Sequence, residues 1–212
     1  MAARKVVFWE VDTQADFMLP GGKLYVSGAE KIIPNIKRLV DEARAGRVLL
    51  ISDACRHLHN DPEFSTFPPH CIRGTPGARI IPEGLAQTFC TVPNDEKFQL
   101  PRDFKKYQQI IIEKQTLDVF DNPHTAAIVD RLGKDVGYIV FGVVTEYCVR
   151  LAAMGLLTRS HHVSLVKDAI ETLKPEDGQR TIAELKALGT RFISTDDAIA
   201  LVRELAPQGS TK

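Results

Sequence analysis

The sequence predicts a three-layer, doubly wound (Rossmann-like) α/β fold with a mostly parallel sheet, in a single domain covering residues 1–212. Two observations carry this prediction. Short β-rich apolar runs alternate with amphipathic helical segments, and several runs are apolar throughout, as in strands covered on both faces. A chain of 212 residues, 44% of them hydrophobic, can bury one sizeable core. In such a fold, ligands bind at the carboxyl ends of the strands.

Six apolar runs are the predicted strands, at 5–11, 47–52, 109–113, 136–142, 162–166 and 191–195. Five other segments carry apolar residues at three- and four-residue spacing, with Gly or a basic residue near the end. This pattern predicts helices within 28–46, 122–134, 145–160, 174–189 and 195–205. The alternation indicates βαβ units with right-handed crossovers.

One segment, from Asp53 to about Leu100, interrupts this alternation. It is rich in Pro, His, Gly and Phe and has little periodicity. A connection of this length in a compact domain is usually functional. Because it leaves the end of the second predicted strand, we expect it to border the ligand-binding edge of the sheet.

The composition narrows the classes of partner. Lys plus Arg and Asp plus Glu both total 27, so we expect a small-molecule ligand and neither a nucleic acid nor a membrane surface. The first apolar run is broken at Glu10, which favours a strand over a signal peptide, and no run approaches the roughly 18–20 residues of a membrane helix. These features predict a cytoplasmic protein. The four irregularly spaced cysteines are then free thiols with packing, metal-binding or catalytic roles.

Cys148 lies in VVTEYCVRLAAMGLL, at the junction of an apolar strand and an apolar helix. Thr145 is the expected N-cap of that helix, which places Cys148 in the first turn. The helix dipole there favours an anion, so the thiol would ionise more easily and become a nucleophile. The alternative is a cysteine buried for packing at a tight turn.

Two other reactive side chains close predicted strands. Asp12 ends the first strand, and Lys114 ends the run QIIIEK. An acid near a thiol can accept its proton, and a neighbouring ammonium keeps the acid charged and stabilises the thiolate. Either residue alone could be a turn residue or a solvated strand end. Together with Cys148, they predict a nucleophilic site where three strands end.

Three motifs, VDTQADF, EKQTLDVF and GVVTEYCV, resemble in order and spacing the Asp, Lys and Cys motifs of nicotinamidases and isochorismatase-like cysteine hydrolases. The resemblance covers nearly the whole chain, to about residue 200. It implies an isochorismatase-like hydrolase fold in which Asp12 is the general base, Lys114 its charged neighbour and Cys148 the nucleophile. It also implies a homo-oligomer and no organic cofactor.

The same resemblance implies an unusual backbone before the nucleophile. The peptide bond between Val143 and Val144 would be cis although neither residue is proline. The N–H groups of Val144 and Cys148 would then form an oxyanion hole for the substrate oxygen.

The resemblance further implies a divalent metal, Zn, Mn or Fe, held by the irregular segment SDACRHLHNDPEFSTFPPHC. Nicotinamidases carry Asp-x-His followed by a later histidine in Pro-Pro-His-Cys, which corresponds to Asp53 and His70. Cys55 stands where the middle histidine belongs. Counting back from DPEF favours His57 as the middle ligand, with His59 next. The alternative is that these histidines only satisfy backbone groups of the loop.

Substrate contacts are predicted by residue type. Phe17, Phe67 and Tyr147 lie in the matching motifs, and a flat aromatic amide would gain about 0.5–1.5 kcal/mol per aromatic pair beyond area burial. Core packing explains Phe17 equally well, and a Trp is common in nicotinamidases where Phe67 stands.

Because true isochorismatases as a group do not carry this cysteine, Cys148 points to the amidase branch. We expect attack on a small amide, release of ammonia or an amine, and hydrolysis of a thioester, with conversion of nicotinamide to nicotinate as the first choice. Three alternatives remain open: a related hydrolase acting on a ureido or other small amide, an isochorismatase-type ether hydrolase, and a binding or assembly module on a retired hydrolase fold.

Overall fold

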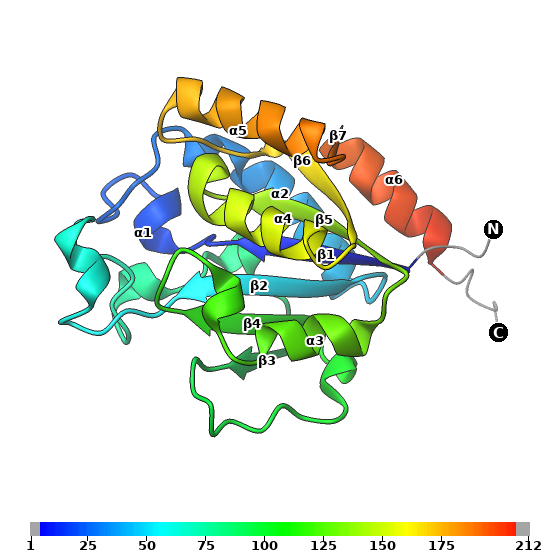
Figure 1. Cartoon of the computed structure of the whole chain (residues 1–212), viewed down its shortest axis with the longest axis horizontal. Coiled ribbons are helices and arrows are strands. Elements are labelled where there is room, and N and C mark those ends of the chain that lie inside the picture. Colours follow the sequence, from blue (N-terminus) through cyan, green and yellow to red (C-terminus); the bar gives the residue numbers. More distant parts are fainter. Residues whose placement is uncertain (1–4, 207–212) are drawn as a thin grey trace.

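The computed structural model describes residues 5–206, and its strands form one sheet between two layers of helices (Figure 1). All pairings in the sheet are parallel, in the order β3-β4-β2-β1-β5-β6-β7. The predicted doubly wound α/β fold is confirmed. The strands are β1 Lys5–Val11, β2 Leu49–Cys55, β3 Phe89–Val92, β4 Gln109–Lys114, β5 Val136–Gly142, β6 His162–Ile170 and β7 Arg191–Ile193.

The α-helices are α1 Ala15–Met18, α2 Ala29–Arg44, α3 Thr125–Leu132, α4 Arg150–Leu157, α5 Pro175–Ala187 and α6 Thr195–Leu205. Helices α2 and α6 pack against each other on one face of the sheet, while α3 and α4 lie in front of the sheet in Figure 1, on the other face. Each layer buries its own apolar cluster, one around Phe8 and Leu39 and the other around Trp9 and Leu156. The sheet is therefore covered on both sides, as its continuous apolar strands predict.

All six predicted strands are present. Strands β1 and β5 have the predicted limits, whereas β2 and β6 run further toward their carboxyl ends, to Cys55 and Ile170. The prediction missed β3, which lies in the segment expected to be irregular. This strand is only four residues long and pairs on one side alone, at the edge of the sheet, so its residues are mostly not buried and show no continuous apolar run.

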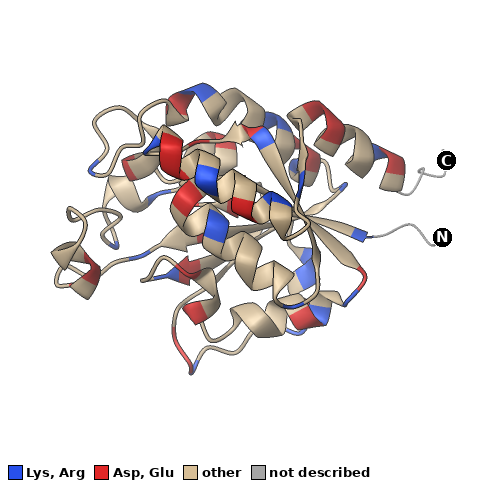
Figure 2. Cartoon of the chain, turned by 45° about the horizontal axis from the view of Figure 1, so that its top comes forward, with Lys and Arg blue, Asp and Glu red and all other residues tan. Residues whose placement is uncertain are grey.

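Acidic and basic residues are interspersed along the helices and loops of the chain, as the colours of Figure 2 show. This distribution matches the equal totals of acidic and basic residues. Over residues 5–206, none of the helices combines the length and the apolar character needed to cross a membrane.

The segment predicted as one helix at 145–160 is divided in two, and the N-cap assigned to Thr145 is corrected. The Oγ1 and N–H groups of Thr145 both donate to the Glu171 carbonyl, at 2.7 and 2.8 Å. The N–H of Val149 bonds to the Val144 carbonyl five residues back, which is the wider turn of a π-helix over Thr145–Val149. Cys148 therefore lies in this π turn, before α4 begins at Arg150.

The order in which strands are added reverses at β1. The chain first adds β2, β3 and β4 on one side of β1, and later adds β5, β6 and β7 on the other side. A crevice at the carboxyl ends of the strands is expected at such a point. Gly142 allows β5 to end beside β1: its φ is +119°, and a Cβ atom there would lie 2.1 Å from the Val11 carbonyl oxygen. Glycine is the one residue type that fits.

Candidate active site

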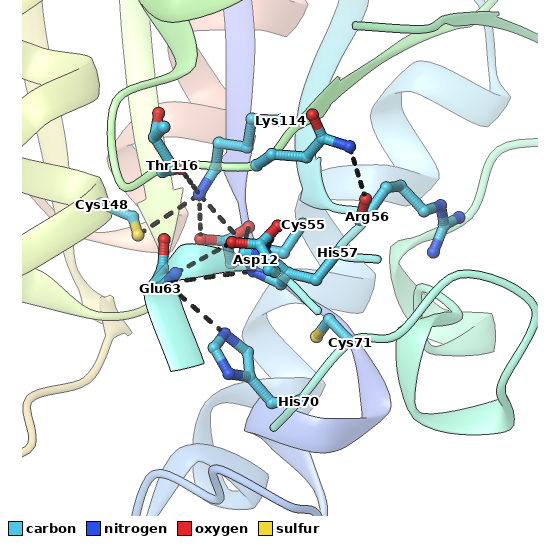
Figure 3. Close-up of polar contacts among 12 residues, drawn as sticks. Asp12, Cys55, Arg56, His57, Glu63, His70, Cys71, Lys114, Thr116 and Cys148 are labelled. Carbon is cyan, nitrogen blue, oxygen red and sulfur yellow. Dashed lines mark hydrogen bonds and ion pairs between the residues drawn. The ribbon is translucent and has the colours of Figure 1, made fainter. Parts of the chain in front are cut away.

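Four adjacent strands, β4, β2, β1 and β5, each place one reactive side chain at this edge: Lys114, Cys55, Asp12 and Cys148 (Figure 3). The ammonium of Lys114 lies at the centre. Its Nζ is 2.8 Å from Asp12 Oδ2, 3.3 Å from Cys55 Sγ and 3.4 Å from Cys148 Sγ. All four side chains are buried. The structure thus brings together the three predicted catalytic residues and adds a second thiol that sequence reasoning did not assign.

Asp12 and Lys114 form a buried ion pair in which each side chain belongs to a residue only 1% exposed. Burial acts to lower the pKa of Lys114, but the carboxylate of Asp12 and the thiols opposite raise that pKa well above its ordinary value. Lys114 is therefore charged. Asp12 has φ +47°, in the left-handed region that Asp tolerates better than most residues, and its N–H donates to the Asp53 carbonyl at 3.2 Å.

The expectation that the Cys148 thiol ionises easily is corrected. Burial, followed by the charge of Asp12, raises the pKa of Cys148 well above its ordinary value, and the neighbouring Lys114 opposes this only in part. Desolvation disfavours the thiolate more strongly than the start of a helix can favour it. The raised pKa favours the protonated thiol, so a Cys148 that acts as a nucleophile would need a nearby base.

The backbone before the nucleophile has the implied conformation. The peptide bond between Val143 and Val144 is cis, and the N–H of Val143 donates to the Val11 carbonyl at 3.0 Å. Val143, Val144 and Cys148 are all buried beside the crevice. An oxyanion hole formed by the N–H groups of Val144 and Cys148 stays a prediction.

A group of possible metal ligands lies beside the Asp12–Lys114 pair. One donor atom from each of Cys55, His57 and His70 lies within 4.8 Å of the others. Among the described residues, neither ring nitrogen of His57 has a hydrogen bond of acceptable geometry, although Asp61 Oδ2 lies 3.0 Å from Nδ1. The Nδ1 of His70 is 2.8 Å from the Pro68 carbonyl, an arrangement that leaves Nε2 free to bind. Unpartnered buried nitrogens beside a thiol fit a divalent metal of the zinc type.

Two of the four predicted metal ligands do not join this group. Asp53 Oδ2 accepts a 2.8 Å hydrogen bond from Trp9 Nε1, and its Oδ1 lies 3.9 Å from Lys114 Nζ. Burial and the charge of Asp12 raise the pKa of Asp53 well above its ordinary value, which favours a neutral carboxyl. His59 is exposed in a turn. Of the four predicted ligands, the structure thus brings together His57 and His70. The third member of the group is Cys55, which was not predicted as a ligand.

Glu63 is a site residue that the sequence prediction missed. Its Oε1 lies 3.9 Å from His57 Nε2 and 3.8 Å from His70 Nε2, facing both rings (Figure 3). Burial raises the pKa of Glu63, as expected for a carboxyl in a partly closed pocket. The DPEF sequence, used only to count back to His57, was the available signal for this carboxylate.

Two further residues of VDTQADF hold the loop that carries the histidines. Gln14 donates to the carbonyls of Cys55 and Ala78, both at 2.8 Å, and accepts from the Cys55 N–H at 2.7 Å. Asp16 accepts from the N–H of Cys71, next to His70, at 2.7 Å. These bonds explain why a polar motif follows β1: it anchors both ends of the segment that carries the possible metal ligands.

The three residues predicted to contact substrate line one pocket together with Cys148. The rings of Phe67 and Tyr147 meet edge to face with centroids 5.9 Å apart, and Phe17 meets the His70 ring at 5.2 Å. The free space in the pocket is only about 30 Å³, roughly that of one or two water molecules. Because small-molecule sites typically measure about 300–1,000 Å³, the side chains that line this pocket must move apart before a substrate ring can enter.

Comparisons with known proteins agree with this geometry. The family model described as the Isochorismatase domain matches residues 7–92 and 83–197. The nicotinamidase of Escherichia coli is 23% identical over 212 residues, covering 88% of this chain and 93% of that protein. A protein of Arabidopsis thaliana described as a probable inactive nicotinamidase is 24% identical over 198 residues, covering 89% and 91%.

Among solved structures, the pyrazinamidase of Pyrococcus horikoshii in complex with zinc superimposes with a TM-score of 0.72 at 28% identity. The match covers 90% of this chain and 99% of that one. The fold and the site define a hydrolase built on a doubly wound α/β sheet. The family match is more specific: the chain belongs to the isochorismatase family.

Proposed function

We propose that this protein is a cysteine amidohydrolase that cleaves the C–N bond of a small amide, with nicotinamide as the first candidate substrate. One observation carries the proposal: a single buried ammonium, Lys114, contacts both the carboxylate of Asp12 and the sulfur of Cys148. A binding module on a retired fold has no need for a nucleophile, a base and a cation within reach of one another.

The geometry supports the following sequence of steps. The Asp12 carboxylate takes the proton of Cys148 as the sulfur attacks the amide carbonyl, and Lys114 stabilises the negative charge that passes between them. The tetrahedral intermediate collapses when Asp12 returns that proton to the departing nitrogen, which releases ammonia or an amine. Water, deprotonated by Asp12, then hydrolyses the thioester, which releases the acid and restores the thiol.

The relatives support nicotinamide as the first candidate, because two of them are described as nicotinamidases and a solved neighbour as a pyrazinamidase. The aromatic lining of the pocket suits a flat ring. Ureido and other small amides, and an isochorismatase-type ether, remain the alternatives. An ether hydrolase of that type would not depend on Cys148, so the two classes respond differently to loss of this thiol.

The test is release of ammonia from nicotinamide, pyrazinamide and ureido acids by the wild type and by Cys148→Ala. We expect turnover of at least one amide by the wild type, and a loss of about 10³-fold or more in the variant, because the covalent route is removed. Cys90→Ala is the matched control, since Cys90 lies on β3 outside the site. Full turnover by Cys148→Ala would contradict the mechanism.

We further propose that Cys55, His57 and His70 hold a divalent metal, with Glu63 close enough to complete the set. The pyrazinamidase neighbour contains zinc, and the thiol and imidazole donors here suit the same ion. When bound, the metal would supply a Lewis acid that orients a substrate ring nitrogen, directly or through water. The residues of this chain would keep their own roles in proton transfer.

Cobalt provides a readout of this site that does not depend on activity. We expect Co²⁺ added to the metal-free protein to give the near-ultraviolet absorption of a thiolate-to-cobalt bond, because Cys55 is the sulfur donor. Cys55→Ser should abolish the band. Cys71→Ser should retain it, because Cys71 is equally buried but lies outside the ligand group. A band that survives Cys55→Ser would refute the assignment.

We also propose that the protein is cytoplasmic and forms a homo-oligomer. The free state of all four cysteines supports a reducing compartment.

A further inference from the structure

A second, wider hollow shares part of its wall with the pocket at Cys148. We call it the outer hollow, and it lies between residues 58–67, residues 115–121 and Leu151. The two cavities share Glu63, Phe67 and Leu117 in their walls. A substrate that extends from Cys148 past Phe67 and Leu117 would enter the outer hollow.

The charged residues that line the outer hollow are all acidic: Asp61, Glu63, Asp118 and Asp121. Among the described residues lining either cavity there is no Lys or Arg. The ammonium of Lys114 lies behind Cys148, 3.4 Å from its sulfur, and it contacts Asp12 at 2.8 Å, so its charge is already balanced.

Three carboxylates of the outer hollow accept hydrogen bonds from backbone N–H or hydroxyl groups. Asp118 Oδ1 accepts from the N–H of Phe120 at 2.9 Å, and Asp121 Oδ2 accepts from Thr116 Oγ1 at 2.7 Å. Asp61 Oδ1 accepts from the N–H of Glu63 at 3.0 Å. Within residues 5–206, none of these three forms an ion pair with Lys or Arg. Asp61 Oδ2 also lies 3.0 Å from His57 Nδ1, so in the described part of the chain the carboxylates of the outer hollow without a basic partner are those of Asp118 and Asp121.

From this arrangement we infer the charge class of the substrate: the site accepts an uncharged or cationic amide and excludes amides that carry a carboxylate. This inference rests on the proposed amidohydrolase function. The inner pocket is lined mainly by apolar and aromatic side chains and has no Lys or Arg in its wall, and the charge of a divalent metal held there would be offset by the Cys55 thiolate and the Glu63 carboxylate. The outer hollow, with its single sign of charge, repels an anion before it reaches Cys148.

The inference decides between two of the candidate substrate groups. Nicotinamide and pyrazinamide are uncharged at neutral pH, whereas ureido acids carry a carboxylate. A ureido acid would have to place that carboxylate against an apolar wall or beside Asp118 and Asp121. Both positions are unfavourable. Against the apolar wall the carboxylate would lose its hydration without gaining a hydrogen bond or a cation, and beside Asp118 and Asp121 it would be repelled by charges of the same sign.

A pair of alkylating reagents tests the inference without any turnover. Iodoacetamide and iodoacetate have nearly the same size and differ in charge, and their rates of reaction at Cys148 can be followed by peptide mass spectrometry. The rate with iodoacetamide is divided by the rate with iodoacetate, and this ratio is divided by the same ratio measured for 2-mercaptoethanol, which corrects for the intrinsic reactivity of the two reagents. We expect iodoacetamide to be favoured by about fivefold or more, and less so as NaCl rises from about 0.02 to 0.5 M, since salt screens the carboxylates.

The variants assign the effect to the outer hollow. Asp118→Asn/Asp121→Asn keeps both hydrogen-bond acceptors and should lower the normalised ratio by about threefold. Asp103→Asn/Asp196→Asn is the matched control, because it removes the same charge from exposed residues outside both cavities and should leave the ratio unchanged. If Asp118→Asn/Asp121→Asn does not fold, the salt dependence of the normalised ratio in the wild type still shows whether charge repulsion slows the reaction of iodoacetate with Cys148.

Three results would overturn the inference: a normalised ratio near one, a ratio that neither salt nor Asp118→Asn/Asp121→Asn changes, or failure of both reagents to reach Cys148. Ammonia release from nicotinamide with a ratio near one would refute the inference and leave the proposed function standing. A high, Asp118- and Asp121-dependent ratio without turnover of any amide would refute the function alone.

Discussion

At the scale of single residues, the site is organised around one buried ammonium. Lys114 is within 3.4 Å of two sulfurs and bonds directly to Asp12. Asp12, Lys114 and Cys148 could be predicted because each ends a recognisable strand, and parallel strands share one carboxyl edge. Cys55 could not be assigned in the same way. Its contact with Lys114 depends on the pairing of β2 with β4, in which these two residues are opposite each other.

Removal of the ammonium should destabilise the protein strongly. In Lys114→Met, the buried Asp12 loses its counter-ion, and we expect the free energy of unfolding to fall by about 3–5 kcal/mol. In Asp12→Asn/Lys114→Met, both charges are absent, so the loss should be clearly smaller. Urea unfolding followed by circular dichroism measures both.

The control for this pair is Lys37→Met. Lys37 pairs with Asp41 at 2.7 Å on the exposed face of α2, where loss of an ion pair costs about 0–1 kcal/mol. Equal destabilisation by Lys37→Met and Lys114→Met would show that burial of the Asp12–Lys114 pair has no energetic consequence.

At the scale of elements, the turn between β5 and α4 places Cys148, the proposed nucleophile. The sequence predicted a helix starting at Thr145, because the apolar spacing is helical and a threonine precedes it. The structure has a π turn there, because Thr145 bonds to Glu171, a residue 26 positions away that local pattern cannot reveal. The existence of a helical segment was predictable, while the form of its first turn was set by a tertiary contact.

Gly142 provides a test of how this turn is held. Gly142→Ala should lower the free energy of unfolding by about 3 kcal/mol or more, because the left-handed backbone and a contact of 2.1 Å to Val11 both act against a side chain. The same change should slow alkylation of Cys148 by iodoacetamide, since β5 would move relative to β1.

Gly133→Ala is the matched control at the end of α3. Gly133 also has a left-handed φ, +103°, but a Cβ atom there meets nothing within 4 Å. We expect a loss of only about 1–2 kcal/mol and an unchanged alkylation rate. Similar effects of the two substitutions would mean that the approach of β5 to β1 does not position the nucleophile.

At the scale of the whole molecule, a buried polar network joins three strands beneath the crevice. Glu10 on β1 accepts hydrogen bonds from Thr13 at 2.8 Å, Ser52 on β2 at 2.6 Å and Gln109 on β4 at 3.3 Å. Burial raises the pKa of Glu10 from 4.5 to about 7, although these hydrogen bonds act to lower it. A residue that sequence reasoning left unexplained thus links the central strands of the sheet.

This network predicts a pH dependence of stability. Because the folded state binds the Glu10 proton more tightly than the unfolded chain, the contribution of Glu10 is greatest below pH 4.5 and falls as the pH rises to about 7. The total loss is about 3 kcal/mol. Comparison of the unfolding free energy of the wild type with that of Glu10→Gln between pH 4.5 and 7 measures it. The expected outcome is a steeper fall for the wild type, and parallel curves would contradict the prediction.

The sequence alone determined the strand and helix order, the parallel sheet and the carboxyl-end positions of Asp12, Lys114 and Cys148, because these follow from local periodicity and the rules of βαβ connection. His70 was also identifiable, from FPPHC. The tertiary structure alone decided that Cys55 and Glu63 join the histidines, that Asp53 bonds to Trp9, and that burial raises the pKa of the Cys148 thiol. The reason is physical: ligand geometry and desolvation depend on residues far apart in the chain, brought together by strand register and by a loop without periodic pattern.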